Sequence, residues 1–211
     1  ESLFYLQQTI DGGYILGGQS TSGISGDKTQ IKQGISDYWI VKTDANGNKL
    51  WDKTFGGDAQ DIFASLQQTS DGGYILGGWS ESSISGDKTQ ASYGSFDYWI
   101  VKTDADGNKL WDKTFGASAK EELYSIKQTV GGGYLIGGDS YSNISGDKTE
   151  NNMGSEQIWV IKIDANGNKL WDKTILTTGH DEVGNAIETK DFTLSFKIER
   201  ISKVKNKLEK H

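Results

Sequence analysis

Apolar and polar side chains alternate along short runs of the chain, and the clearest run is YWIVKT at 38–43. Its aromatic and β-branched residues suit a pleated, half-buried surface, so the run predicts a β-strand. The next residues, DANGN at 44–48, are turn formers, because Asp bonds its own backbone and Asn and Gly tolerate positive φ. A second apolar run, LWDKTF at 50–55, follows. The pattern therefore predicts a β-hairpin that carries two tryptophans, Trp39 and Trp51.

This hairpin sequence occurs three times, and its tryptophans recur at intervals of sixty residues. A fixed period of this size is typical of repeat architectures. Each unit has four strand-like pieces: one before a DGG or GGG turn, one after it and, beyond a long polar loop, the two strands of the hairpin. The units cover about 1–56, 57–116 and 117–176, a partial fourth unit starts at 177, and an extra strand with a basic tail occupies 190–211.

Four short antiparallel strands per unit predict an all-β fold, a β-propeller-type array of four-stranded blades. Each blade of such an array buries both faces against its neighbours, which accounts for the apolar residues on both faces of the strand at 38–43. The β-trefoil is the main alternative, since it also contains three four-stranded units. The incomplete fourth unit argues against it.

The second unit, QQTSDGGYILGGWS…FDYWIVKTDADGNKLWDKTFG, resembles the repeats of uncharacterised bacterial secreted or cell-surface β-propeller proteins. More distantly it is similar to WD40-type and PQQ-type propeller repeats, which also carry a DG-type turn and a late Trp. These families share architecture rather than activity, so the resemblance implies a fold and no particular function. The cofactor-binding residues of the PQQ-type enzymes cannot be located in this sequence, and no cofactor is expected.

The blade order of the WD40-type repeats implies where each strand and loop lies. The first strand of each unit would be nearest the central axis, and the long loop would share one face with the blade-to-blade connections. The DGG and DANGN turns would lie on the opposite face. The resemblance thus places six residues at or near a channel: Gln7, Gln8, Gln67, Gln68, Lys127 and Gln128.

The long loops contain the repeated sequence ISGDKT, and function often resides on the longer loops of a rigid scaffold. The charged residues of this motif are the candidate ligand-binding residues Asp27, Lys28, Asp87, Lys88, Asp147 and Lys148. They would present a ring of polar groups to sugar hydroxyls or to a peptide. The alternative is structural: the Asp would accept backbone N–H bonds, and the Ile would anchor the loop on the blade. The residues that follow the motif differ between units, as expected of a binding surface or of plain drift.

Trp79 is the one tryptophan outside the hairpins. It is a further candidate, since an indole can stack on a sugar ring or on a side chain of a partner; a packing role is the alternative. The DANGN turns resemble the start of a calcium loop but lack its glycine at the sixth position and its glutamate at the twelfth. Turn formation is therefore favoured, and no metal site is predicted.

Motifs of catalysis are absent from the sequence. It has two His, one of them terminal, and no Ser-His-Asp order, HExxH, P-loop or GxGxxG followed by a helix. We therefore expect a non-catalytic binding or scaffold module for a protein or glycan ligand. The alternative is a carbohydrate-active enzyme that uses two loop carboxylates. The candidate pairs are Asp58 with Asp61 and Glu121 with Glu122.

Composition and charge narrow the range of partners. The chain has no Cys and a net charge of −7; the residues from Lys190 onward carry +4, which leaves −11 for the rest. An acidic body argues against nucleic acid, and no apolar run approaches the roughly 20 residues that span a bilayer. An extracellular or cell-surface location is expected. No signal peptide is evident at Glu1, so either a leader has been removed or the sequence belongs to a longer protein.

Three and a half units are fewer than the roughly four blades that a propeller needs to close. An open arc would leave the apolar faces of its first and last units exposed, which is unusual for a soluble monomer. We therefore predict a homodimeric ring in which the end of each chain lies against the start of the other. The alternative is that the missing blades belong to a longer protein.

Overall fold

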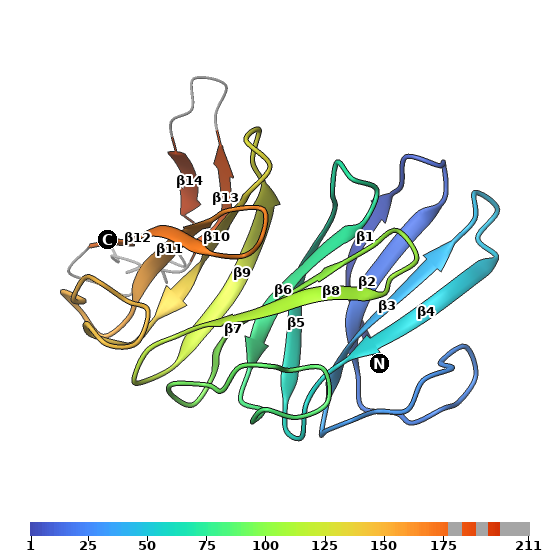
Figure 1. The fold of residues 1–211 in the computed structure, drawn as a ribbon, viewed down its shortest axis with the longest axis horizontal. Helices are drawn as coiled ribbons and strands as arrows, with labels where there is room; N and C mark the ends of the chain where they lie inside the picture. Colours follow the sequence, from blue (N-terminus) through green and yellow to red (C-terminus); the bar gives the residue numbers. More distant parts are fainter. Residues whose placement is uncertain (177–182, 189–193, 199–211) are drawn as a thin grey trace, which may run out of the picture.

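The computed structural model describes residues 1–176, 183–188 and 194–198. Its strands form three four-stranded antiparallel sheets and one two-stranded sheet (Figure 1). Within each large sheet the strands follow one another in chain order, so each sheet is a meander. The described part of the chain contains no helix, and hence none that is long and apolar enough to cross a membrane. The predicted all-β fold with four antiparallel strands per unit is confirmed.

The strands have the following bounds. Sheet 1 consists of β1 (Ser2–Gln8), β2 (Tyr14–Ser20), β3 (Asp37–Thr43) and β4 (Lys49–Phe55). Sheet 2 consists of β5 (Asp61–Gln68), β6 (Tyr74–Ser80), β7 (Asp97–Thr103) and β8 (Lys109–Phe115). Sheet 3 consists of β9 (Glu121–Gln128), β10 (Tyr134–Ser140), β11 (Gln157–Ile163) and β12 (Lys169–Ile175). The small sheet pairs β13 (Val183–Glu188) with β14 (Leu194–Ile198). The predicted basic tail beyond 198 lies outside the described residues.

The hairpin turns form as their residues predict. Asp44 Oδ1 accepts hydrogen bonds from the backbone N–H groups of Asn46 and Asn48 at 2.8 and 2.9 Å. Gly47 has a φ of 84°, a left-handed conformation that favours glycine. The same bonds recur in the second and third hairpins. The DANGN residues are therefore turn formers.

The first strands of the sheets lie side by side, because β1 contacts β5 and β5 contacts β9. Side chains reach along this row. Gln7 Oε1 accepts a hydrogen bond from the backbone N–H of Gln68 at 2.9 Å, and Gln67 Oε1 accepts one from that of Gln128 at 2.8 Å. The first strands therefore form a row, and the side chains of Gln7 and Gln67 bind the next strand in it.

The sheets do not close into a ring, so a complete propeller is not formed (Figure 1). Sheets 1, 2 and 3 are separate and do not form one barrel, which excludes the β-trefoil. The architecture is an open array in which successive four-stranded sheets pack face to face.

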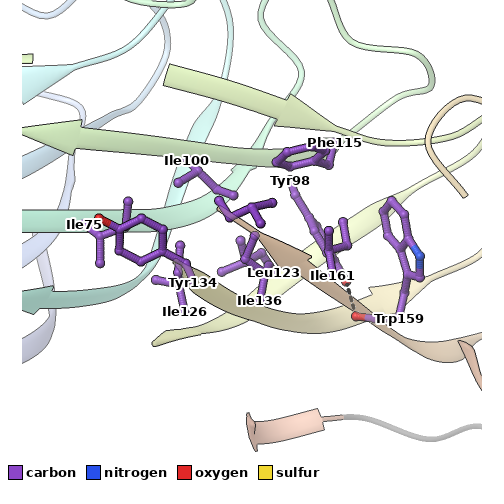
Figure 2. Close-up of a cluster of buried hydrophobic side chains, with 11 residues drawn as sticks. Ile75, Tyr98, Ile100, Phe115, Leu123, Ile126, Tyr134, Ile136, Trp159 and Ile161 are labelled. Carbon is purple, nitrogen blue, oxygen red and sulfur yellow. Dashed lines mark hydrogen bonds between the residues drawn. The ribbon is translucent and has the colours of Figure 1, made fainter. Parts of the chain in front are cut away.

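Two buried clusters fill the spaces between the large sheets. Between sheets 2 and 3, Tyr98 packs on Trp159 and its hydroxyl donates to the Trp159 backbone oxygen at 3.2 Å (Figure 2). Between sheets 1 and 2, the Tyr38 hydroxyl donates to the Trp99 backbone oxygen at 3.0 Å. A glycine at 17 permits this approach, since a Cβ there would lie 2.4 Å from the Phe63 ring. The repeat thus uses the same contacts at both junctions.

The side of sheet 1 that faces away from sheet 2 is not covered in this way. We call it the outer face of sheet 1, and it consists of Leu3, Leu6, Leu16, Trp39 and Val41. Leu3 and Leu6 are 60% and 61% exposed. An apolar face of the first unit is therefore exposed, while Tyr5 and Trp51 of the same unit pack toward sheet 2. On sheet 3 the far face is covered, because Leu135, Ile158 and Val160 are buried there and β13 contacts β9 and β10.

Candidate functional site

The three long loops and the sheet-to-sheet connections meet at one end of the array, which we call the loop face. It consists of loops 21–36, 81–96 and 141–156 and connections 56–60 and 116–120. The backbone N–H of Asp58 donates to Ser85 Oγ at 2.8 Å, and that of Ser118 donates to Ser145 Oγ at 3.0 Å. In Figure 1 the first two long loops lie along the lower edge, opposite the hairpin turns. The long loops and the sheet-to-sheet connections therefore share one face of the array.

The lysines of the ISGDKT motif point into the protein. Lys28, Lys88 and Lys148 are 2%, 1% and 1% exposed. Lys28 Nζ donates to Thr54 Oγ1 and to the Gln30 carbonyl, each at 2.8 Å. Burial lowers the pKa of Lys148 to about 8, and its ammonium group lies over the Trp159 ring. These lysines fix the loop to the fourth strand of their own sheet or to the loop itself, and their charges do not reach the surface.

An aspartate on the fourth strand, Asp52, is the centre of this attachment. Its carboxylate accepts hydrogen bonds from Thr29 N at 2.9 Å, Thr29 Oγ1 at 2.6 Å and Trp39 Nε1 at 3.1 Å, and it forms an ion pair with Lys49. Burial acts to raise the pKa of this carboxyl, but these bonds outweigh it and lower the pKa to about 2. Asp112 and Asp172 make the same bonds in their own units.

Sequence reasoning missed Asp52, Asp112 and Asp172. The available signal was a charged residue that occupies the same position in a strand of all three units, flanked by Trp and Lys. Such a residue is either exposed or paired. The bonds show that it is paired. They also explain why the DKT of the loop and the WDK of the strand recur together.

The aspartates of the ISGDKT motif have different environments in the three units. Asp87 Oδ2 accepts a bond from Gly56 N at 3.4 Å, and Asp147 Oδ2 accepts one from Gly116 N at 3.2 Å. Each thereby binds the connection that precedes its own sheet. The Asp27 carboxylate is exposed and makes no hydrogen bond or ion pair within the described residues. Among the described residues, then, only the first unit presents this carboxylate both exposed and without a hydrogen bond, since Asp87 and Asp147 are partly exposed and bonded.

The isoleucines of the motif do not anchor the loops, and that structural expectation is wrong. Ile24, Ile84 and Ile144 are 64%, 63% and 58% exposed. Anchoring is done by the buried lysine and the threonine of the same motif, which leaves the isoleucine outside. The variable residues that follow also expose large apolar side chains at the loop tips, namely Ile31, Ile35, Tyr93 and Met153. The loop face is therefore more apolar than the sequence suggests.

Trp79 lies at the end of β6 next to the loop face and packs against sheet 3. Its ring is edge-on to Tyr124, with the centroids 5.6 Å apart. The Tyr124 hydroxyl donates to Glu122, which forms an ion pair with Lys120 at 2.8 Å. Trp79 is partly exposed, so the indole is packed on one side and accessible on the other. The corresponding positions between sheets 1 and 2 hold Gln19 for Trp79 and Ala64 for Tyr124, so this aromatic pair occurs once.

The carboxylate pairs considered for catalysis are not both accessible. Asp61 and Glu121 are fully buried. Asp61 accepts bonds from Gly57 N at 2.7 Å and Ser82 Oγ at 3.0 Å, while Glu121 accepts bonds from Ser140 and Ser142. The other member of each pair is also bonded: the exposed Asp58 accepts bonds from Ser83, and the partly buried Glu122 is paired as described above. Within the described residues, no group of three or more His, Cys, Asp or Glu side chains could bind a metal ion.

Fold and site define the class: a repeat protein of three four-stranded antiparallel sheets whose long loops gather on one face. No protein-family profile matches the chain, and no curated protein is similar to it. Among solved structures, it is similar to a protein of unknown function from Bacteroides caccae, with 11% identity over 96% of this chain and a TM-score of 0.49. This chain spans 58% of the length of that protein. Domains 7, 8 and 9 of the S-layer protein SbsC show 12% identity, over 80% of this chain and 79% of theirs, with a TM-score of 0.18.

Proposed function

We propose that the chain is a non-catalytic binding or scaffold module of propeller type, which presents its loop face to a protein or glycan ligand. One observation carries the proposal: large apolar side chains recur at the exposed loop tips at intervals of sixty residues, while the turns beneath them are fixed by buried bonds. Isolated exposed apolar residues are common, but a repeated set on one face is typical of an interaction site.

The rest of the loop face supports the same function. The frame is constant between units and the tips differ, so the surface combines rigidity with specificity. Trp79 with Tyr124 adds one aromatic position that suits a sugar ring or a partner's side chain. Asp27 adds an accessible carboxylate. The buried Lys28, Lys88 and Lys148 would act on a ligand only through the loop shape that they maintain.

The propeller arrangement is proposed from the row of first strands and the face-to-face packing of the sheets. An extracellular or cell-surface location is proposed from the resemblance to secreted and cell-surface propellers. Closure by a second copy and closure by further blades both remain predictions. The enzymatic alternative is disfavoured because Asp61 and Glu121 are buried and accept bonds from the backbone N–H groups of their own connections.

A glycan array, a peptide array and a panel of hydrolase substrates, applied to the same sample, test the function. We expect retention on an array without turnover of any substrate. Turnover that is lost in Asp58→Ala would contradict the proposal and establish a carbohydrate-active enzyme.

A pair of matched variants tests the site. Replacing Ile24, Ile84 and Ile144 by Ser removes three exposed side chains from the loop face, and we expect binding to weaken by about tenfold or more. The control replaces Leu50, Leu110 and Leu170 by Ser; these residues are 57%, 57% and 59% exposed on the fourth strands, away from the loop face. Equal binding by the two triple variants would rule the loop tips out as the ligand site.

A further inference from the structure

The outer face of sheet 1 repeats, position by position, the face by which sheet 2 packs on sheet 1. The residues Leu3, Leu6, Leu16, Trp39 and Val41 correspond, at sixty-residue spacing, to Phe63, Leu66, Leu76, Trp99 and Val101. The residues of sheet 2 are at most 2% exposed. On sheet 1, Leu3, Leu16, Trp39 and Val41 border a hollow of about 450 Å³, and Leu6 is 61% exposed. The outer face therefore has the composition of a packed junction without the neighbour that covers it.

Sheet 1 also has the residues that make the other contacts of the junction, but not the groups of a neighbouring sheet that would meet them. Asp87 accepts a bond from Gly56 of the preceding connection, whereas the corresponding Asp27 carboxylate has no partner within the described residues. Gly107 lies against Trp51 of the preceding sheet, so that a Cβ on it would be 2.9 Å from the ring. For Gly47, the corresponding glycine, nothing lies within 4 Å of that place.

Sheet 1 also has the backbone groups by which sheets 2 and 3 bind the sheet before them. The Trp99 and Trp159 carbonyls each accept a bond from a tyrosine hydroxyl of the preceding sheet. The backbone N–H groups of Gln68 and Gln128 each donate to a glutamine side chain of that sheet. The Trp39 carbonyl and the Gln8 N–H occupy the same positions in sheet 1. A sheet that satisfied all of these contacts would therefore need a specific set of side chains.

That complementary set occurs on the opposite faces of sheets 1 and 2. In sheet 1 it is Gln7, Tyr38, Phe55 and Gly56, and in sheet 2 it is Gln67, Tyr98, Phe115 and Gly116. In sheet 3 the four positions hold Lys127, Ile158, Ile175 and Leu176. A lysine cannot accept the N–H bond and an isoleucine has no hydroxyl to donate. The face of sheet 3 is also already buried next to β13.

We propose that the outer face of sheet 1 is a docking face for a further four-stranded sheet of this repeat, one that carries the Gln, Tyr and Phe-Gly set of sheets 1 and 2. Sheet 3 and the small sheet of a second copy are not this partner, because sheet 3 lacks the set and its far face is buried next to β13. The proposal concerns the packing of the array and does not depend on the ligand of the loop face.

The test supplies such a sheet. A copy of residues 61–120 is fused directly ahead of Glu1, which keeps the sixty-residue period because Glu1 corresponds to Asp61 and Glu121. The chain has no cysteine, so Leu6→Cys places one thiol on the outer face. We expect this thiol to react with an aromatic disulfide reagent about tenfold or more slowly in the extended chain than in the original one. Leu50→Cys, exposed on β4, is the control and should react equally in both.

A second extended chain tests the chemistry of the docking sheet. In its added copy the four positions receive the residues of sheet 3, through Gln67→Lys, Tyr98→Ile, Phe115→Ile and Gly116→Leu. Protection of the Leu6→Cys thiol should then be lost. Equal protection by both added copies would overturn the specificity that we propose. Absence of protection by the first added copy, folded or not, would overturn the docking face, because sheets 2 and 3 fold on the same contacts.

The unextended chain provides the last measurement. We expect the reactivity of its Leu6→Cys thiol to be independent of protein concentration. A rate that falls as the concentration rises, together with a doubled mass in light scattering, would show that a second copy covers the face and would overturn the proposal.

Discussion

The outer face of sheet 1 and the corresponding face of sheet 2 have nearly the same sequence and opposite environments. Leu66 is fully buried under sheet 1, and Leu6, sixty residues earlier, is 61% exposed. Trp99 is fully buried, whereas Trp39 is partly exposed. The repeat thus determines which residues can pack, and the presence of a neighbouring sheet determines which ones do. The two faces are an internal control for every statement about packing in this molecule.

The largest expected difference is between the two tryptophans. Trp99→Ala removes a buried indole from the junction of sheets 1 and 2, and we expect the free energy of unfolding to fall by about 3–5 kcal/mol. Trp39→Ala should cost less than half as much, since its ring already meets solvent. Both variants lose one hydrogen bond, to Asp112 at 3.2 Å and to Asp52 at 3.1 Å, so this term cancels. Urea unfolding of the whole chain measures both, and equal losses would mean that the outer face of sheet 1 is covered in solution.

The next effect concerns charge at a covered junction. Burial, together with repulsion from Glu121 of the next sheet, raises the pKa of Asp97 from its ordinary value of 3.8 to about 7. Between these two values the folded chain binds a proton that the unfolded chain has lost, so stability falls as the pH rises from about 4 to above 7. Asp97→Asn does not titrate there. We expect this variant to gain stability relative to the original chain as the pH increases, by on the order of a few kcal/mol at pH 8.

Asp52 is the matched control, because its pKa is lowered to about 2. Its contribution to stability therefore changes with pH in the opposite direction to that of Asp97. Its contribution is present above the ordinary pKa and is lost as the pH falls towards 2. Asp52→Asn should therefore lose stability at neutral pH and approach the original chain in acid. Parallel pH profiles for the Asn variants at 97 and 52 would contradict the assignment of the two environments.

Local patterns were sufficient to predict the strands, the hairpin turns and the repeat, because each depends on residues close in sequence. The DANGN turn is an example, since Asp44 bonds residues two and four positions later. The attachment of the loops was not predictable in this way. Lys28 meets Thr54, and Thr29 meets Asp52, over 26 and 23 residues. A charged residue in a polar loop gives no local sign that it will be buried.

The same reason explains the isoleucine of the loop motif. An apolar residue at the start of a loop suggests an anchor. Here the lysine four residues later, Lys28, takes the buried position, and Ile24 stays at the surface. Ring closure could not be predicted either, because it depends on which sheets are present rather than on the pattern within one sheet. Of the aromatic pair of Trp79 and Tyr124, the sequence indicates only the tryptophan, because its partner belongs to the next unit.

The hairpin glycines provide a smaller contrast. Gly47 and Gly107 have φ values of 84° and 75°, so replacement of either by Ala strains the backbone by about 1 kcal/mol. Gly107 also lies against Trp51 and Lys53 of the preceding sheet, with a Cβ site 2.9 Å from each. We expect Gly107→Ala to cost roughly 1 kcal/mol more than Gly47→Ala in thermal or urea unfolding. The opposite order would mean that Gly47, too, has a neighbour.

The smallest expected effect is that of one hydroxyl group. Tyr38→Phe removes the bond to the Trp99 carbonyl and leaves the ring in place against Phe63 and Trp99. The carbonyl keeps its position between two strands of sheet 2, so no acceptor is left without a bond to the sheet. We expect a loss of about 1 kcal/mol in urea unfolding, well below that of Trp99→Ala. Tyr14 is the control, since it holds the place of Tyr74 on the uncovered side of sheet 1 and is partly exposed; Tyr14→Phe should change stability little. A loss at Tyr38 no greater than that at Tyr14 would show that the hydroxyl does not contribute to the junction. The tyrosine would then specify packing through its ring alone, and the isoleucine in its place on sheet 3 would be a smaller departure from the repeat than its chemistry suggests.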